Sequence, residues 1–286
     1  MGWDKKTKAV PKAKEDERIH IMIGVPIEHG SDGLGIGVYR FLHCLQELNQ
    51  MKGHRYRYSW QMVIDKTPVE WARNLIVGMF LKSDAQKLWF IDNDMIPPDN
   101  ALSMLDVTGD IIAGMAMAFD HGNKEKNKRT KLKLCLFKHH PTEETFMPVV
   151  PETGQKAIKI DAAGTATMLI DRKVLEDRRL WGDCVYKALD GSEKDLRNEV
   201  EDPDWGPPIF RFIRRPNGHG LRGEDIDFSW RAKQLGYEVI GCPGIRFGHN
   251  KNVNLDTILD LVNQTALAYG QSIMEDISNA DKSKTA

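Results

Sequence analysis

The sequence predicts a single-domain α/β fold with a mostly parallel central sheet flanked by helices. One reason is the apolar run 87–91, which ends abruptly at Asp92-Asn93-Asp94. Such a short aromatic and branched run is typical of a strand buried on both faces of a parallel sheet. The other reason is that strand-like segments alternate with segments of helical spacing, beginning with Ile19–Ile27. The length of 286 residues allows one large domain of this kind.

Local sequence patterns predict the elements before the strand that ends at Asp92. The predicted order is a strand at 19–27, a helix at 38–51, a strand at 56–64 and a helix from 67 to about 83. Pro26 marks the end of the first strand. Thr67 is predicted to cap the second helix, with Pro68 at its first position and Glu70 completing a capping box.

A glycine-rich loop at 30–37 precedes the first predicted helix. One interpretation is a phosphate cradle at the N-terminus of that helix. The spacing does not match the dinucleotide-binding fingerprint, and loop flexibility is the favoured explanation.

The second half of the chain has less regular signals. The predicted elements are a helix at 98–105, a strand at 110–117, a strand or bend at 158–170, a helix at 172–180, a helix from 224 that ends at Gly236, a strand at 237–240 and a helix at 255–274. The acidic segment 183–208 reads as a long loop. We expect a disordered basic tail at 1–17, the main domain at 18–252, and a C-terminal helix and tail at 253–286.

Composition favours a soluble cytoplasmic protein. The formal net charge of −1 gives no global attraction to nucleic acid or to an anionic membrane. The four cysteines are scattered without a CxxC pair, which is typical of reduced thiols. No apolar run approaches the roughly 20 residues that cross a bilayer. The N-terminus lacks the apolar core of a secretory signal.

Asp92 and Asp94 are the first candidate site residues. The carboxyl ends of strands are where open α/β sheets bind ligands. Carboxylates suit Mg²⁺ or Mn²⁺, and such an ion can clamp a diphosphate. The plainer interpretation is that one of the two acids caps a turn before Pro97-Pro98.

Other candidates have equally plain alternatives. Arg73 is either a surface charge or a bidentate ligand for a diphosphate. The acids Glu224, Asp225 and Asp227 lie at a helix start, which the helix dipole favours in any protein. The basic segments 124–138 and 211–222 are solvated loops or docking loops for a phosphate-bearing acceptor.

In combination, these signals resemble the metal-dependent GT-A glycosyltransferases. The order is an Ala-Arg-Asn helix, an Asp-x-Asp strand end, a Gly-Glu-Asp helix start and a histidine after a late strand. The likeness is greatest to inverting family-2-like enzymes, especially compact ones from bacteriophages, and it covers about residues 19–250. It implies a GT-A type, Rossmann-like sheet. The loop at 28–37 and the segment 183–208 depart from the pattern.

The resemblance implies a role for each matching residue. Asp92, Asp94 and His249 would hold the metal, with Asp94 the direct ligand, and an imidazole favours Mn²⁺ over Mg²⁺. Pro26, Arg73, Asp92 and Asn93 would bind the donor. Asp225 matches the general base of the family. Glu224 and Asp227 compete for that role, and Arg231 is a candidate salt-bridge partner for this acidic cluster.

The expected function is transfer of a sugar, with inversion, from a nucleoside-diphosphate sugar to a hydroxyl. UDP-sugar is the expected donor. A hydroxymethylated pyrimidine in phage DNA is one acceptor hypothesis, and the enzyme would then lie in the host cytoplasm. The alternatives are a cell-surface glycan or small-molecule acceptor, a metal-dependent nucleotidyltransferase, and a non-enzymatic protein that binds nucleotide sugars or nucleic acid.

Overall fold

The computed structural model describes most of the chain between residues 16 and 250. The described ranges are 16–27, 34–66, 68–120, 131–142, 145–181, 185–187, 193–195, 206–211, 213–214 and 221–250. The predicted tail at 1–17 lies almost wholly outside these ranges, as do the predicted helix at 255–274 and most of the segment 183–208. Predictions for those parts remain predictions.

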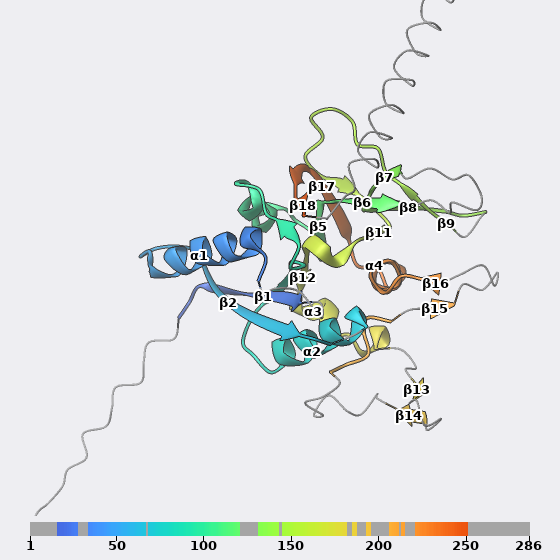
Figure 1. Cartoon of the computed structure of the whole chain (residues 1–286), viewed down its shortest axis with the longest axis horizontal. Coiled ribbons are helices and arrows are strands. Elements are labelled where there is room, and N and C mark those ends of the chain that lie inside the picture. The colour runs from blue at the N-terminus through green and yellow to red at the C-terminus, as the bar shows by residue number, and fades with distance from the viewer. Residues whose placement is uncertain are drawn as a thin grey trace, which may run out of the picture.

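A seven-stranded mixed sheet forms the centre of the described residues (Figure 1). Its spatial order is β10 (Ile158–Lys159), β17 (Val239–Arg246), β5 (Ile111–Met115), β12 (Met168–Asp171), β3 (Lys87–Phe90), β1 (Ile19–Ile27) and β2 (Tyr56–Ile64). The β1–β2, β1–β3 and β5–β17 pairs are parallel, whereas β12 runs against both of its neighbours and β10 against β17. The mostly parallel α/β sheet is therefore confirmed.

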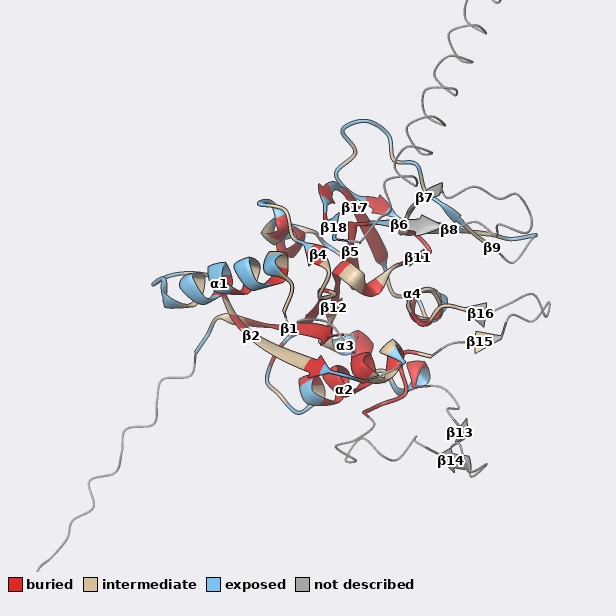
Figure 2. Ribbon diagram, in the orientation of Figure 1, coloured by how far each residue is buried: buried red, intermediate tan, exposed pale blue. Residues whose placement is uncertain are grey.

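Helices cover both faces of this sheet. The helix α1 (Ile36–Gln50) and the 3₁₀ turn η1 (Ala101–Asp106) pack on one face. The helices α2 (Val69–Leu81), α3 (Arg172–Leu175) and α4 (Glu224–Gln234) pack on the other. Figure 2 shows the buried residues concentrated between these layers. The described part of the chain is one α/β domain, as predicted.

The strand β3 shows why the apolar run 87–91 is continuous. Trp89 and Ile91 face the α1 side, whereas Leu88 and Phe90 face the α2 side. All four side chains are fully buried because both faces of the sheet are covered. A strand with one wet face would have alternated with polar residues.

The ends of several helices and of one strand differ from the predictions. The helix α2 begins at Val69, with Pro68 at its N-cap, so Glu70 lies in the first turn. Thr67, the predicted cap, is outside the described residues. The predicted helix 98–105 is the 3₁₀ helix η1 at 101–106 rather than an α-helix, and the predicted helix 172–180 divides into α3 and the 3₁₀ helix η4 (Arg178–Leu180). The predicted strand 237–240 continues to Arg246.

The other strands of the described residues form one three-stranded and four two-stranded sheets. They are β4 (Met95–Ile96), β6 (Met117–Asp120), β7 (Lys131–Leu134), β8 (Leu136–His140), β9 (Thr145–Pro148), β11 (Ala162–Ala163), β13 (Val185–Lys187), β14 (Glu193–Asp195), β15 (Ile213–Arg214), β16 (Leu221–Arg222) and β18 (Gly248–His249). The basic run 120–140 is therefore not simply a loop, because β7 pairs with β6 and β8 pairs with β9 and β11. No helix in the described residues is long and apolar enough to cross a membrane.

Candidate functional site

The candidate site lies at the edge of the sheet where the parallel strands end. Asp92, Asn93 and Asp94 form the turn between β3 and β4, closed by a 3.0 Å hydrogen bond from Met95 N to the carbonyl of Asp92. The backbone N–H of Asp92 donates to the carbonyl of Ala166 (3.1 Å), just before β12. The helix α2 begins near this edge because β2, which precedes it, is parallel to β3 through β1.

The glycine-rich loop contacts this turn directly. Oδ1 of Asn93 accepts a 2.7 Å hydrogen bond from Gly35 N. A Cβ atom on Gly35 would lie 2.1 Å from the carbonyl oxygen of Asn93, and one on Gly37 would lie 2.7 Å from that of Met95. These two glycines are needed because the two backbones approach closely. The sequence alone had favoured loop flexibility.

Asp94 and His249 come together through the pairing of β4 with β18. Nδ1 of His249 lies 2.8 Å from the carbonyl oxygen of Met117, and Nε2 lies 3.1 Å from Oδ2 of Asp94. A carbonyl only accepts, so Nδ1 carries the proton. Nε2 then faces the carboxylate either as the second N–H of an imidazolium or as a lone pair that shares a cation with Asp94.

This pair fits a divalent cation. Two ligands that are each about 2.1 Å from one ion, at a right angle, lie roughly 3 Å apart, close to the 3.1 Å between Nε2 of His249 and Oδ2 of Asp94. The described residues contain no group of three or more His, Cys, Asp and Glu side chains arranged to hold a metal. Further ligands would be donor phosphate and water, which Mg²⁺-type sites commonly use.

Asp92 is engaged differently from Asp94. Nη2 of Arg73 donates to both carboxylate oxygens of Asp92 at 3.0 Å, and Nη1 of Arg73 donates to Glu224. Arg73 is only 4% exposed, and its Nε has no hydrogen-bond partner. The predicted diphosphate ligand is therefore a buried bridge between the end of β3 and the start of α4. A metal ion bound to Asp92 would repel the Arg73 guanidinium and so weaken these hydrogen bonds.

The three acids at the start of α4 have different surroundings. Glu224 is buried against Arg73. Asp227 is 1% exposed and accepts from Nε of Arg231 (2.6 Å), while Arg222 and Arg211 lie 3.5 and 3.7 Å away. Arg231 is thus the salt-bridge partner that the sequence indicated. Both acids are compensated by arginine, as buried carboxylates require.

Asp225 has a carboxyl group with a raised pKa. Burial of the carboxylate and the nearby charge of Glu224 raise the pKa of Asp225 to about 7, although the charge of Arg73 opposes both effects. The carboxyl group is desolvated although the residue as a whole is only half-buried. Its Oδ2 lies 3.6 Å from the position of a Cβ on Gly164, so the small residues 162–164 let the backbone pass close to Asp225.

Pro26 lies within β1 and is buried, opposite Val63 of β2. The ladder between β1 and β3 reaches only to Gly24, so Pro26 lies beyond it. This position is near the carboxyl end of β1, where the resemblance placed the nucleotide.

Two acids near this edge were missed as site residues. Asp65 follows β2 with a φ of 58°, an uncommon conformation for a non-glycine residue, and its N–H donates to the carbonyl of Ile27 (3.1 Å). Glu70 was interpreted only as part of a helix cap. It is 7% exposed, and burial raises the pKa of its carboxyl group. The sequence signal was the position of each acid just beyond β2.

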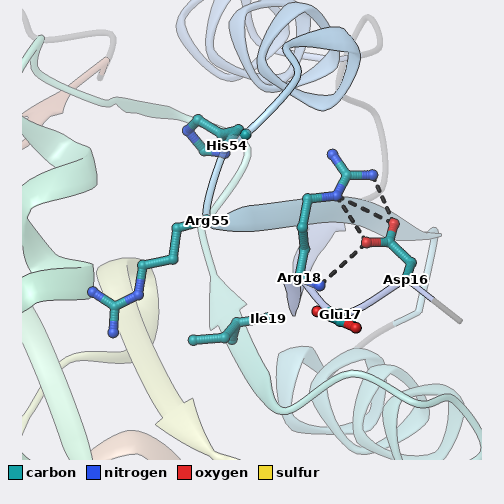
Figure 3. A pocket seen from close by; sticks show the side chains of 7 residues that line it. Asp16, Glu17, Arg18, Ile19, His54 and Arg55 are labelled. Atoms are coloured by element: carbon teal, nitrogen blue, oxygen red, sulfur yellow. Dashed lines mark hydrogen bonds and ion pairs between the residues drawn. The ribbon is translucent and has the colours of Figure 1, made fainter.

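A pocket of about 650 Å³ lies elsewhere. It is lined by Asp16, Glu17, Arg18, Ile19, Gly53, His54 and Arg55, and Figure 3 shows the side chains around it. These residues precede β1 and β2, so the pocket is at the opposite edge of the sheet from Asp92 and Asp225. The candidate metal and base residues lie at the carboxyl edge instead.

The sequence matches no known protein-family profile and no curated protein. Solved structures with related backbones include A197 from STIV, with 14% identity and a TM-score of 0.43 over 82% of this chain and 87% of that one. GalNAc-T7 with UDP, GalNAc and Mn²⁺ has 13% identity and a TM-score of 0.41 over 84% of this chain and 45% of that one. The inositol-1-phosphate CTP transferase from T. maritima has 12% identity and a TM-score of 0.33 over 80% and 86%. Likenesses this weak carry no argument, so function is argued from the site.

Proposed function

We propose that this protein is a metal-dependent glycosyltransferase that moves a sugar from a nucleoside-diphosphate sugar to a hydroxyl acceptor with inversion. The observation that carries the proposal is the contrast among the acids of α4. Glu224 and Asp227 bind arginines, whereas burial together with the neighbouring Glu224 charge raises the pKa of Asp225 to about 7. A base with a pKa near the working pH is effective in proton abstraction.

The residues divide into a donor side and an acceptor side. Asp94 and His249 would hold Mn²⁺ or Mg²⁺, which neutralises the charge of the leaving diphosphate when bound. Asp92, Asn93 and Pro26 lie near the ends of β3 and β1, where we place the nucleotide, and we add Asp65 to this side. The Asp225 carboxylate accepts the proton of the attacking hydroxyl. Attack on the side of the sugar opposite the diphosphate inverts the anomeric carbon.

The donor class is tested by incubating the protein with UDP-, GDP-, CDP- and dTDP-sugars in the presence of Mn²⁺. Release of a nucleoside diphosphate supports the glycosyltransferase, with a UDP-sugar as the expected donor. Release of pyrophosphate would instead identify a nucleotidyltransferase. Binding without turnover across acceptors would identify a binding protein.

We also propose a hydroxymethylated pyrimidine in DNA as the acceptor. The basic segments 124–138 and 211–222 support this, although most of their residues lie outside the described ranges. Contacts with phosphates release counterions, so acceptor affinity should fall steeply between 50 and 200 mM salt, by roughly 10-fold or more for a few contacts. Equal activity on a free sugar at both salt concentrations would contradict the DNA acceptor.

A further inference from the structure

The guanidinium group of Arg73 contacts carboxylates on both the donor side and the acceptor side of the site. Arg73 binds Asp92 on the donor side and Glu224 beside the candidate base. Glu70, one helical turn earlier on α2, is buried and its Oε2 has no hydrogen-bond partner. Buried carboxylates are costly unless a cation compensates them. The charge of Arg73 is therefore divided among more acids than it can neutralise.

The protonation of Asp225 depends on how the charge of Arg73 is shared among these acids. The charge of Arg73 favours the ionised form of Asp225, whereas the charges of Glu224 and Asp92 and the burial of the carboxyl group favour the protonated form. Asp225 also accepts a 2.7 Å hydrogen bond from Ile226 N, and Cys135 lies on the same side of Gly164. Removing Asp92 from Arg73 would leave more of the positive charge for Glu224 and Asp225.

We propose that Arg73 is a positioning residue that makes the base available only when the donor is bound. When Asp92 leaves Arg73 for the metal–donor complex, Arg73 keeps its contact with Glu224 and its charge acts more strongly on Asp225. The Asp225 carboxyl group then releases its proton to solvent and becomes the carboxylate that the transfer requires. This inference rests on the proposed function.

The coupling has a thermodynamic consequence that does not depend on turnover. If donor binding removes a proton from Asp225, then raising the pH must tighten donor binding by the same linkage. The metal-bound nucleoside diphosphate, which carries the same phosphates as the donor, is a sufficient probe. Near pH 7, where Asp225 is about half protonated, binding should release up to roughly half a proton from this group.

The experiment is titration calorimetry of the full chain with nucleoside diphosphates and Mn²⁺ in two buffers of different ionisation enthalpy at pH 7. The difference in heat between the buffers gives the number of protons released. We expect release in the wild type and a clear loss of it in Asp225→Asn, which should still bind the nucleotide. Comparison with Asp225→Asn subtracts protons that other groups lose, including His249.

The role of Arg73 is tested by Arg73→Lys, which keeps the charge but lacks the planar fork that reaches two carboxylates. We expect it to bind nucleotide with less proton release, while Arg246→Lys, at an exposed position of β17, behaves as the wild type. Equal release from the wild type and Asp225→Asn, or full release from Arg73→Lys, would overturn the coupling alone. If UDP, GDP, CDP and dTDP all fail to bind, the proposed function fails with it.

Discussion

At the scale of single residues, three neighbouring acids of similar chemistry have different roles because of what surrounds them. Asp227 is surrounded by arginines, Glu224 binds Arg73, and Asp225 lies beside the backbone of Gly164. The sequence indicates Arg231 on the same helix as a partner, but not the other arginines, which come from α2, the segment before β15 and the residue before Gly223. It therefore left Glu224, Asp225 and Asp227 as competitors.

Asp225→Asn should nearly abolish sugar transfer, because general-base catalysis contributes about 10²- to 10⁴-fold. The amide keeps the shape of the side chain, so the variant should still bind the donor. Turnover and nucleotide affinity are measured on the same preparation, with the exposed Asp99→Asn as the control. A variant that also loses donor binding would show that Asp225 is not simply the base.

Asp94→Ala should weaken Mn²⁺ binding at least tenfold, which is about 1.4 kcal/mol, because it removes the carboxylate that faces His249. His249→Gln should have an effect in the same direction. Electron paramagnetic resonance of free Mn²⁺ measures both. Unchanged affinity in Asp94→Ala would show that the metal ligands lie elsewhere.

At the scale of elements, the sequence pattern predicted the limits of strands whose apolar residues are buried in the sheet. The strand at 19–27 and the strand at 56–64 have the predicted limits, since the first is buried along almost its whole length and the second alternates between apolar and polar residues. The pairing of β4 with β18, which brings His249 to Asp94, could not be derived from patterns because both strands have only two residues. The bridging role of Arg73 was missed for a related reason: its partners are 19 and 151 residues away.

The contact between the glycine-rich loop and the turn after β3 gives a stability prediction. Gly35→Ala would place a Cβ atom 2.1 Å from the carbonyl oxygen of Asn93. Its backbone φ of −58° is ordinary, so the cost comes from overpacking, typically about 1–3 kcal/mol. Gly244→Ala is the matched control, since nothing lies within 4 Å of its Cβ position. Chemical denaturation compares the two, and equal stabilities would mean that this contact is not closely packed.

At the scale of the whole molecule, the candidate site should reduce stability as the pH rises. The pKa of Asp225 is about 7 in the folded protein, above its ordinary value of 3.8. Between these values the unfolded chain loses this proton while the folded protein retains it, so this group makes unfolding more favourable as the pH rises from about 4 to 7. Above pH 7 the folded protein holds a buried carboxylate, and the lost stability is not recovered.

Asp225→Asn should therefore melt at a higher temperature than the wild type at pH 8, and the two melting temperatures should converge near pH 4. The carboxyl group of Asp177 acts in a different range, because its hydrogen bonds from Arg179 lower its pKa to about 2, and its contribution is lost only in stronger acid. Calorimetric scans from pH 4 to pH 8, without metal or nucleotide, measure the difference. If the difference in melting temperature is constant across this range, Asp225 has an ordinary pKa, and the strongest support for its role as the base is lost.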